Sequence, residues 1–565
     1  MSTIKHDGEA RAIEPGRTIF DLADDLKMAV PTSCKRSGTC HECIVEVTRG
    51  AEALSPPSQA EAFLRGTYRL ACQAHITRDD IDIEFAPLRR TPRIVTDTLD
   101  EDGPIVLDPL VTRDDENVFY DGELIDRYRG HLLGLAIDLG TTTVVVDLVD
   151  LASGKSLKRA AFENPQRFGG SDVMNRISYD CKPAHKGELQ RAVASEINRA
   201  IIAMTGALAV PRQAIYEVAI AANTTMRDIF FKLDVESVGQ RPYKSTIEHE
   251  WRAGKRATTA LVTRAKRLGL RVNAKARAYG LPLIASHVGA DTAADLLALD
   301  LTPEGEETVL LVDMGTNTEV VLRHKGRMIA ASCPAGPAFE GGLVTYGMPA
   351  YDGAIESIRL NTTTDRFDYR TIGDAPPIGL CGSGLIDLLA ELCRHGRMTP
   401  KGVFTADRRL QSLTVVPAQG ITLSREDASN LAQAKAANYC GQYIVLRLAG
   451  ADPRDVARLY LAGGFAQYVD VSNAVLIGLL AAVPEERVVK VGNAALKGAR
   501  IALLSRTKRL GLDALVARIE HVELETTPDF FEIFVEGCQF KPMPETLAAP
   551  TIRGAAAAER HRSTV

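Results

Sequence analysis

The sequence predicts two kinds of fold in one chain: a small α+β domain built around a cysteine-rich loop, then a large α/β body made by duplication. Four of the 10 cysteines fall within the first 72 residues. Two strand–turn–strand segments with the same pattern start at Leu133 and Thr308. At 565 residues, the chain is too long for a single hydrophobic core and should divide into roughly three or four domains.

The composition argues against several classes of function. The formal net charge of −5 gives no excess of Lys and Arg for neutralising phosphates, so we expect no nucleic-acid partner. No apolar run reaches the roughly 18 residues that span a bilayer, and Met1–Pro15 lacks the basic and apolar regions of a signal peptide. We therefore expect no membrane association and a cytoplasmic location. Thiols stay reduced there, so the cysteines should be ligands, catalysts or core residues rather than disulfides.

Composition shifts along the chain predict its domains. Residues 1–88 contain a short helix over Thr18–Leu26 and two strands, Ile44–Val47 and Ile81–Phe85, that alternate in polarity. Residues 89–130, which include the run TPRIVTDTLDEDGPIVLDPL, are predicted to form a linker. The α/β body is predicted to comprise a first domain over 131–207 and a larger one over 208–540. Residues 541–565 are Ala-rich and polar, which indicates a frayed tail.

The cysteine pattern of the first domain predicts a [2Fe–2S] cluster. Cys34, Cys40 and Cys43 lie in CKRSGTCHEC and Cys72 follows in YRLACQ, which gives C-x5-C-x2-C-x28-C. Such a cluster needs four thiolates around one small volume. A glycine at position 38 allows the positive φ that turns backbone N–H groups toward the sulfurs. Zinc ribbons favour two C-x2-C pairs, and a redox dithiol would leave two of these cysteines unexplained.

Two turns in the body have the chemistry of phosphate loops. In LGLAIDLGTTTVVVDLVD, apolar strands flank a turn with Asp138, Gly140, Thr141, Thr142 and Thr143. The turn offers hydroxyl and N–H groups to phosphate, and the carboxylate can hold Mg²⁺ through water. The design recurs in TVLLVDMGTNTEVV, where the matching positions are Asp313, Gly315, Thr316, Asn317 and Thr318. Two such hairpins suit a duplicated fold that grips phosphates from two sides.

Two further glycine-rich turns are candidates for nucleotide contact. LYLAGGFAQYV places Gly463, Gly464 and Phe465 between a strand and a helix, where glycines would let the backbone approach a base and ribose. GLCGSGLIDLL places Gly382, Ser383 and Gly384 at a helix start that could face an anion. For each of these turns, a tight strand–helix connection without a ligand remains the alternative. Neither a P-loop nor a strand-linked GxGxxG motif is present.

This set of motifs resembles the superfamily of actin, sugar kinases and heat-shock chaperones, abbreviated ASKHA. The resemblance implies an actin/sugar-kinase-like, ribonuclease-H-like duplicated α/β body that closes over Mg-ATP. It places phosphate 1 at Asp138–Thr143, phosphate 2 at Asp313–Thr318 and adenosine at Gly463–Phe465. Asp291, in HVGADTAAD, is then a candidate to orient the attacking water, with a solvated helix-cap Asp as the alternative. Asn223, in ANTTM, is either an inter-lobe contact or a strand-end turn.

The first domain and the body together resemble the ATP-dependent reductive activators of corrinoid proteins. The spacing before the second cysteine and the RLACQ context are similar to the adrenodoxin branch of ferredoxins, which have an α+β β-grasp fold. NPQRFGGSDVMNRISY, PAGPAFEGG and VGNAALKGA add to the resemblance. It implies one-electron reduction of Co(II) to Co(I) in a corrinoid protein of a methyl-transfer system, coupled to ATP hydrolysis. It also implies a low-potential electron donor upstream and a homodimer.

Three other functions remain open from the sequence. An ASKHA-type small-molecule kinase with a ferredoxin redox sensor would need a particular metabolite for ATP turnover. A ferredoxin-like shuttle on a vestigial scaffold is disfavoured by the intact Asp138 and Asp313 loops. Activators of radical dehydratases share the ASKHA fold, but hold a [4Fe–4S] cluster and lack the Cys34–Cys72 segment.

Overall fold

The computed structural model describes residues 3–6, 9–26, 28, 30, 36–38, 43–62, 64, 66–87, 105–407, 409–464 and 466–547. The chain forms two compact units, each described here by itself. Unit 1 comprises Met1–Asp300 and Asn493–Ala517, and unit 2 comprises Leu301–Gly492 and Arg518–Val565. No helix of the described residues has the length and apolar character needed to cross a bilayer.

The N-terminal domain is the predicted α+β ferredoxin fold. Its mixed five-stranded sheet has the order β2-β1-β5-β3-β4. The one α-helix among its described residues begins with a capping box, in which Thr18 and Asp21 exchange side-chain and backbone hydrogen bonds. The element bounds are β1 Thr3–His6, β2 Glu9–Ala12, α1 Ile19–Asp25, β3 Ile44–Arg49, β4 Tyr68–Leu70 and β5 Ile83–Pro87.

Part of the predicted linker is folded. Strands β6 (Val111–Asp114), β7 (Asn117–Tyr120) and β8 (Glu123–Arg127) form an antiparallel sheet with buried Val111 and Val118. The strands are short and mostly polar, so their periodicity was too weak to indicate a sheet. The linker prediction is therefore wrong for these residues, while residues 88–104 lie outside the described part of the chain.

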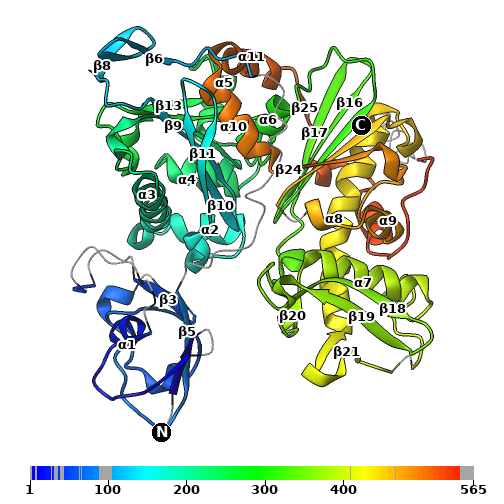
Figure 1. Ribbon diagram of the computed structural model, residues 1–565. Helices are drawn as coiled ribbons and strands as arrows, with labels where there is room; N and C mark the ends of the chain where they lie inside the picture. Colours follow the sequence, from blue (N-terminus) through cyan, green and yellow to red (C-terminus); the bar gives the residue numbers. More distant parts are fainter. Residues whose placement is uncertain are drawn as a thin grey trace, which may run out of the picture. The chain divides into compact units, whose positions relative to one another are not determined.

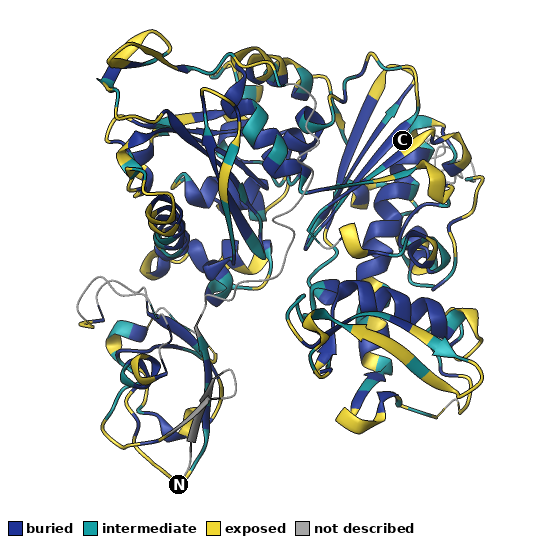
Figure 2. Cartoon of the chain, viewed as in Figure 1, coloured by how far each residue is buried: buried dark blue, intermediate teal, exposed yellow. Residues whose placement is uncertain are grey.

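The body of unit 1 is built on a six-stranded sheet with the order β11-β10-β9-β12-β14-β13 (Figure 1). Strands β9, β10 and β11 are antiparallel neighbours, and β12 runs parallel to β9. Most residues of β9, β10 and β12 are buried (Figure 2). The strands are β9 Leu133–Leu139, β10 Thr143–Asp150, β11 Ser156–Glu163, β12 Ile215–Ala222, β13 Leu261–Arg264 and β14 Arg277–Gly280. The helices are α2 Val173–Asp180, α3 Glu188–Ala207, α4 Thr224–Phe230, α5 Thr246–Arg252, α6 Ala290–Ala298, α10 Ala494–Leu504 and α11 Arg506–Val516.

The domain boundary predicted at 207/208 falls inside this sheet. Strand β12 follows the boundary, yet it pairs along its length with β9, which precedes it. The compact units divide at Asp300/Leu301 instead, and α10 and α11 return to unit 1 from late in the chain. A sequence pattern shows where a strand is, but not with which strand it pairs.

Unit 2 repeats the architecture. Its main sheet has the order β24-β23-β15-β16-β17-β25, with β15, β16 and β17 antiparallel and β23 parallel to β15. The long helix α8 packs on β16 and β17 (Figure 1). The main-sheet strands are β15 Val309–Met314, β16 Thr318–His324, β17 Arg327–Cys333, β23 Arg458–Ala462, β24 Val488–Gly492 and β25 Glu520–His521. The remaining strands are β18 Ala354–Asn361, β19 Arg366–Thr371, β20 Gly379–Leu380, β21 Ser412–Val416 and β22 Ile421–Ser424. The helices are α7 Gly382–Arg394, α8 Arg425–Ala449, α9 Val471–Leu476 and α12 Phe530–Gly537.

The two sheets confirm the predicted duplication. The series β11-β10-β9-β12-β14 in unit 1 corresponds to β17-β16-β15-β23-β24 in unit 2, with the same pairing directions. In each series, the turn between the first two strands in chain order carries an Asp-x-Gly-Thr sequence. Both predicted phosphate loops thus occupy the same place in equivalent folds, which is the ASKHA-type body predicted from the sequence.

Candidate functional site

Two of the four predicted cluster ligands are described, and the fold brings them together. Cys43 lies just before β3 and Cys72 just after β4, and these strands pair. The two Sγ atoms are 3.3 Å apart, both thiols are buried, and neither forms a disulfide. Cys34 and Cys40 lie outside the described residues. A buried pair of converging thiols is half of the four-thiolate donor set that a [2Fe–2S] cluster requires, so these two residues fit the predicted group.

The surroundings of Cys72 support a thiolate ligand. Gln73 Nε2 donates toward Cys72 Sγ at 3.5 Å, and such donors tune a cluster's potential. Gly38 has φ +80°, as predicted, and a Cβ there would lie 3.0 Å from the side chain of Gln73. Burial alone raises the pKa of Glu61, but hydrogen bonds from Arg69 and from backbone N–H groups hold it below its usual value. Since one of those N–H groups belongs to Leu70 of β4, the charged Glu61 fixes the strand that leads to Cys72.

The phosphate 1 turn is a tight connection between β9 and β10, as the sequence predicts for a strand–turn–strand segment. The N–H of Gly140 donates to the carbonyl of Thr143 at 3.0 Å, and a Cβ on Gly140 would lie only 2.6 Å from that oxygen. The buried Asn164 braces the turn, because its Nδ2 donates to Gly140 O at 2.8 Å and its N–H donates to Thr142 O at 2.7 Å. Asp138, the carboxylate expected to organise Mg²⁺, is the penultimate residue of β9, next to this turn.

Other elements of unit 1 converge on the same loop. Asn223, the N-cap of α4, donates from Nδ2 to Thr141 Oγ1 at 3.0 Å, so it occupies a strand-end turn. Gly289 packs so tightly on Asn223 that a Cβ would lie 2.5 Å from the Asn223 Cα. This contact places Asp291 near the loop, in the first turn of α6. The N-cap of α6 is Gly289, so Asp291 is two residues inside the helix and not its cap.

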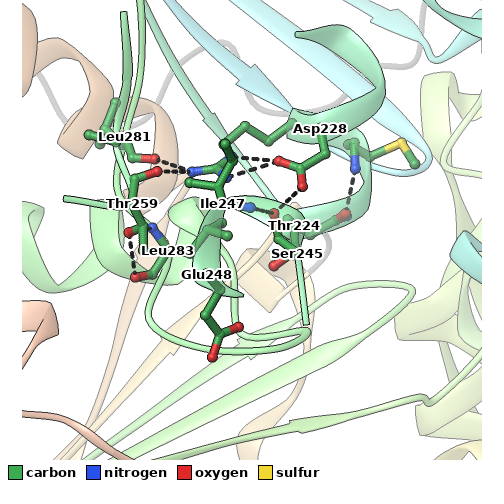
Figure 3. A network of polar contacts seen from close by, with 12 residues as sticks. Thr224, Asp228, Ser245, Ile247, Glu248, Thr259, Leu281 and Leu283 are labelled. Atoms are coloured by element: carbon green, nitrogen blue, oxygen red, sulfur yellow. Dashed lines mark hydrogen bonds and ion pairs between the residues drawn. The ribbon is translucent and has the colours of Figure 1, made fainter. Parts of the chain in front are cut away.

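A buried polar network fixes the start of α4 (Figure 3). Arg227 and Asp228 are fully buried and form an ion pair with an N–O distance of 2.9 Å. Burial lowers the pKa of Arg227, and the neighbouring Asp228 carboxylate opposes that shift. Arg227 also donates to the carbonyls of Thr259 and Leu281 at 2.8 and 3.2 Å. These bonds hold α4 against two other segments of unit 1.

The same network reaches the segment before α6. Thr224 Oγ1 donates to the carbonyl of Ser286 at 2.5 Å, and the N–H of Ser286 donates to the buried Glu248 at 2.8 Å. Ser286 has φ +50°, a conformation that is costly without such support. Bonds to Thr224 and Glu248 therefore hold Ser286 in the turn that leads to Asp291.

The phosphate 2 turn of unit 2 has the sequence pattern of the first turn, but its closing hydrogen bond spans one residue fewer. The N–H of Gly315 donates to Asn317 O at 3.1 Å, and Asp313 sits at the position equivalent to Asp138. Thr316 and Thr318 are buried, and Thr316 Oγ1 donates to the Glu340 carboxylate at 2.6 Å. Carboxylate oxygens are hard ligands, so Asp138 and Asp313 both fit the chemistry of Mg²⁺.

The predicted adenosine turn lies directly against the phosphate 2 strand. Gly463 has φ +108°, and a Cβ there would lie 2.1 Å from the carbonyl oxygen of Met314 in β15. Its N–H donates to Gly492 O at 3.1 Å. Gly464 follows it, and Phe465 lies outside the described residues. Within unit 2, the fold thus joins the two predicted elements of nucleotide binding.

The fourth glycine-rich turn has a packing role. Gly382, Ser383 and Gly384 form the buried first turn of α7. Ser383 Oγ donates to the carbonyl of Glu356 at 2.7 Å, and a Cβ on Gly384 would lie 2.2 Å from the carbonyl oxygen of Ile355. These contacts with β18 account for Ser383 and Gly384 and support the interpretation of a tight strand–helix connection.

The structure adds residues that were not predicted as site residues. Asn493, the N-cap of α10, donates from Nδ2 to Asp138 Oδ2 at 2.7 Å. Glu340 accepts from Thr316, and Gln73 contacts Cys72. Asn493 and Glu340 lie within VGNAALKGA and PAGPAFEGG, so the motifs held the signal without indicating which polar residue mattered.

Comparison with known proteins decides the family. Residues 4–77 match the 2Fe-2S iron-sulfur cluster binding domain, residues 133–304 the RACo middle region, and residues 307–550 the C-terminal domain of RACo, the ASKHA domain. The chain is 30% identical over 432 residues to the corrinoid activation enzyme RamQ of Eubacterium limosum, an alignment covering 72% of this chain and 70% of RamQ. The chain belongs to the RACo family.

Other relatives agree with membership of the RACo family. A reductase of Methanosarcina barkeri, named for the Co(II) methylated amine-specific corrinoid protein, is 23% identical over 433 residues and covers 72% of this chain and 76% of its own. The solved structure of a reductive activator for corrinoid, iron-sulfur protein superposes with a TM-score of 0.69 at 29% identity. That similarity covers 96% of this chain and 98% of the other. RACo-family architecture thus extends over nearly the whole chain.

Proposed function

We propose that this chain is an ATP-dependent reductive activator that returns a corrinoid protein of a methyl-transfer system from Co(II) to Co(I). The observation that carries the proposal is the joining, in one chain, of a converging cysteine pair with two equivalent Asp-x-Gly-Thr loops. The names of the relatives support it, since they are a corrinoid activation enzyme and a reductase of a corrinoid protein.

The N-terminal domain supplies the electron. Cys34, Cys40, Cys43 and Cys72 would hold a [2Fe–2S] cluster, which supplies one electron at low potential when it is bound. That electron reduces Co(II) to Co(I) on the partner. An upstream low-potential donor then has to return one electron for each turnover. Burial of Cys43 and Cys72 keeps water from the sulfurs, and Gln73 offers a hydrogen bond to one of them.

The body binds and hydrolyses Mg-ATP in this proposal. In unit 1, Asp138 would hold Mg²⁺ and the hydroxyl and N–H groups of its loop would hold phosphate. In unit 2, Asp313 and its loop would offer the same groups. Asp291 orients the attacking water, and the glycines at 463 and 464 approach the adenosine. Plant-type [2Fe–2S] centres have reduction potentials of about −400 mV. If the Co(II)/Co(I) couple of the partner has a lower potential, the electron transfer is uphill and needs a second source of free energy. Each deficit of roughly 59 mV costs about tenfold in equilibrium for one electron.

The test is anaerobic reduction of a Co(II) corrinoid protein. The reconstituted chain, a low-potential reductant and the corrinoid protein are mixed with or without Mg-ATP, and the Co(I) absorption band is followed. Cys72→Ser and Asp138→Asn variants separate the two proposed sites. We expect Co(I) only with Mg-ATP, with Cys72 present and with Asp138 present.

Two results would contradict the proposal. Co(I) formation at the same rate without ATP would show that the body does not drive the transfer. ATP consumption that depends on a small metabolite, and that persists in Cys72→Ser, would favour a kinase with a redox sensor.

Sedimentation of the same preparation checks the proposed homodimer.

A further inference from the structure

One residue outside the predicted loops contacts the phosphate 1 carboxylate. Asn493 Nδ2 donates to Asp138 Oδ2 at 2.7 Å, and Asn493 Oδ1 accepts from the N–H of Leu496 at 2.8 Å. The second bond caps the N-terminus of α10. Since a backbone N–H can only donate, it fixes which end of the amide is the acceptor. The amino group is therefore the end that faces the carboxylate.

The two bonds make different chemical demands. Ser, Thr, Asp and Asn all serve well as N-caps, so capping alone does not require an amide. The contact with Asp138 does require a donor, because an ionised carboxylate only accepts. Among these four cap residues, an ionised Asp has no donor, and the hydroxyls of Ser and Thr lie one bond nearer the backbone than the amino group of Asn. Both Asn493 and Asp138 are half-buried, which strengthens a charge-assisted hydrogen bond relative to one in water.

The position of Asn493 in the chain adds to the argument. Its preceding residue, Gly492, ends β24 and accepts the N–H of Gly463 from the expected adenosine turn. One peptide step therefore separates a residue that contacts that turn from the residue that holds Asp138. Asn493 is also the first residue after the chain returns from unit 2 to unit 1.

We propose that Asn493 is the positioning residue for Asp138, holding its carboxylate oriented for the magnesium-bound nucleotide. The inference rests on the proposed function, since it presupposes that Asp138 serves Mg-ATP. Asn493 acts through Asp138 and takes no part in the chemistry itself. Its donor holds one of the two carboxylate oxygens in place, and this determines the direction of the other oxygen.

Three variants separate this role from helix capping. Asn493→Ser keeps a cap and removes the amide N–H that contacts Asp138, because the serine hydroxyl lies one bond nearer the backbone. Asn493→Asp keeps a cap and places a second carboxylate against the first, which raises the pKa of such a pair. Asp172→Ala is the control, because Asp172 caps α2 of the same unit and its removal costs only bonds with the backbone and side chain of Asn175.

The measurement is Mg-ATP affinity by calorimetry between pH 6 and 8, with thermal melting of each variant. We expect Asn493→Ser to bind about tenfold more weakly at pH 7 with an unchanged melting temperature, the loss typical of one charge-assisted hydrogen bond. Asn493→Asp should bind more weakly at pH 6 than at pH 8, while the wild type changes little. Asp172→Ala should melt earlier and bind as the wild type does.

The outcomes distinguish the inference from the proposed function. If the wild type binds Mg-ATP and both Asn493 variants bind within twofold of it at every pH, Asn493 is only a cap and the inference fails alone. If the wild type binds no Mg-ATP, the proposed function fails and the inference fails with it.

Discussion

At the scale of single residues, Gln73 is expected to influence the reduction potential of the cluster. Its side-chain N–H lies 3.5 Å from Cys72 Sγ, and donors to a ligand sulfur stabilise the more negative, reduced form. We expect Gln73→Leu to lower the reduction potential. A hydrogen bond worth about 0.5–1.5 kcal/mol corresponds to about 20–60 mV for one electron. A redox titration followed by electron paramagnetic resonance measures it, and an unchanged or raised potential would contradict the assignment.

Lys435 is a second residue with a measurable consequence. It is fully buried in unit 2, its Nζ donates to Gln539 O at 2.6 Å, and burial lowers its pKa to about 7 despite nearby thiols such as Cys538. The folded chain therefore binds this proton less readily than the unfolded chain between about pH 7 and 10.5. Over that window, the lysine makes the free energy of unfolding rise with pH.

The variant Lys435→Met should lack that rise. We expect it to be more stable than the wild type at pH 7, and the difference to shrink by about 2 kcal/mol by pH 9. Burial raises the pKa of the Cys440 thiol to about 12, so in the folded state that thiol stays protonated across the window. Urea unfolding of both proteins at several pH values measures the difference, and parallel pH curves would show that Lys435 is charged in the fold.

At the scale of elements, the packing of α10 on α6 depends on a glycine. A Cβ on Gly498 would lie 1.9 Å from the carbonyl oxygen of Ala294 in α6. We expect Gly498→Ala to destabilise unit 1 by about 1–3 kcal/mol, the usual cost of overpacking a core. The control is Gly511→Ala in the next helix, where a Cβ meets nothing within 4 Å. That change should stabilise by about 0.5–1 kcal/mol through helix propensity. Chemical denaturation compares the pair, and equal effects would refute the close contact.

The helices and strands show which parts of the fold a sequence pattern can predict. The two loop-bearing hairpins were predictable, because each combines an apolar run on both sides with a turn that needs glycine. The helix over Thr18–Leu26 was also predicted, and it spans Ile19–Asp25 in the structure. The strands β6, β7 and β8 were missed, since four or five mostly polar residues carry little periodicity. The boundary at 207/208 failed because strand pairing is non-local.

At the scale of the whole molecule, the cluster domain and the nucleotide loops should respond separately to mutation. Each domain has its own sheet and core, and independent sites usually show additive effects. We expect Cys72→Ser to lose the signal of the reduced cluster while binding Mg-ATP within about twofold of the wild type. Asp313→Asn should keep the cluster and bind Mg-ATP about tenfold more weakly, as loss of a charged contact implies. Calorimetry and electron paramagnetic resonance spectra of both variants test this. If either variant lost both the cluster signal and Mg-ATP binding, the domains would fold as one cooperative unit.

Prediction of the candidate site was limited by the same physics as prediction of the fold. The cysteine spacing and both Asp-x-Gly-Thr turns are local, so a linear pattern indicates them. Asn493 meets Asp138 across 355 positions, and only the folded chain shows that contact. The GLCGSGL turn illustrates the reverse case, since Gly384 is explained by close packing on β18.

The close contact between α6 and α10 has a consequence for the thermodynamics of ligand binding. Asp291 lies in the first turn of one helix, and the residue that holds Asp138 caps the other. Because α6 and α10 are in backbone contact at Gly498, the positions of these two carboxylates are fixed relative to each other before a ligand binds. These parts of unit 1 then lose little conformational entropy when a nucleotide binds. A smaller share of the favourable binding enthalpy is therefore cancelled by ordering of the protein.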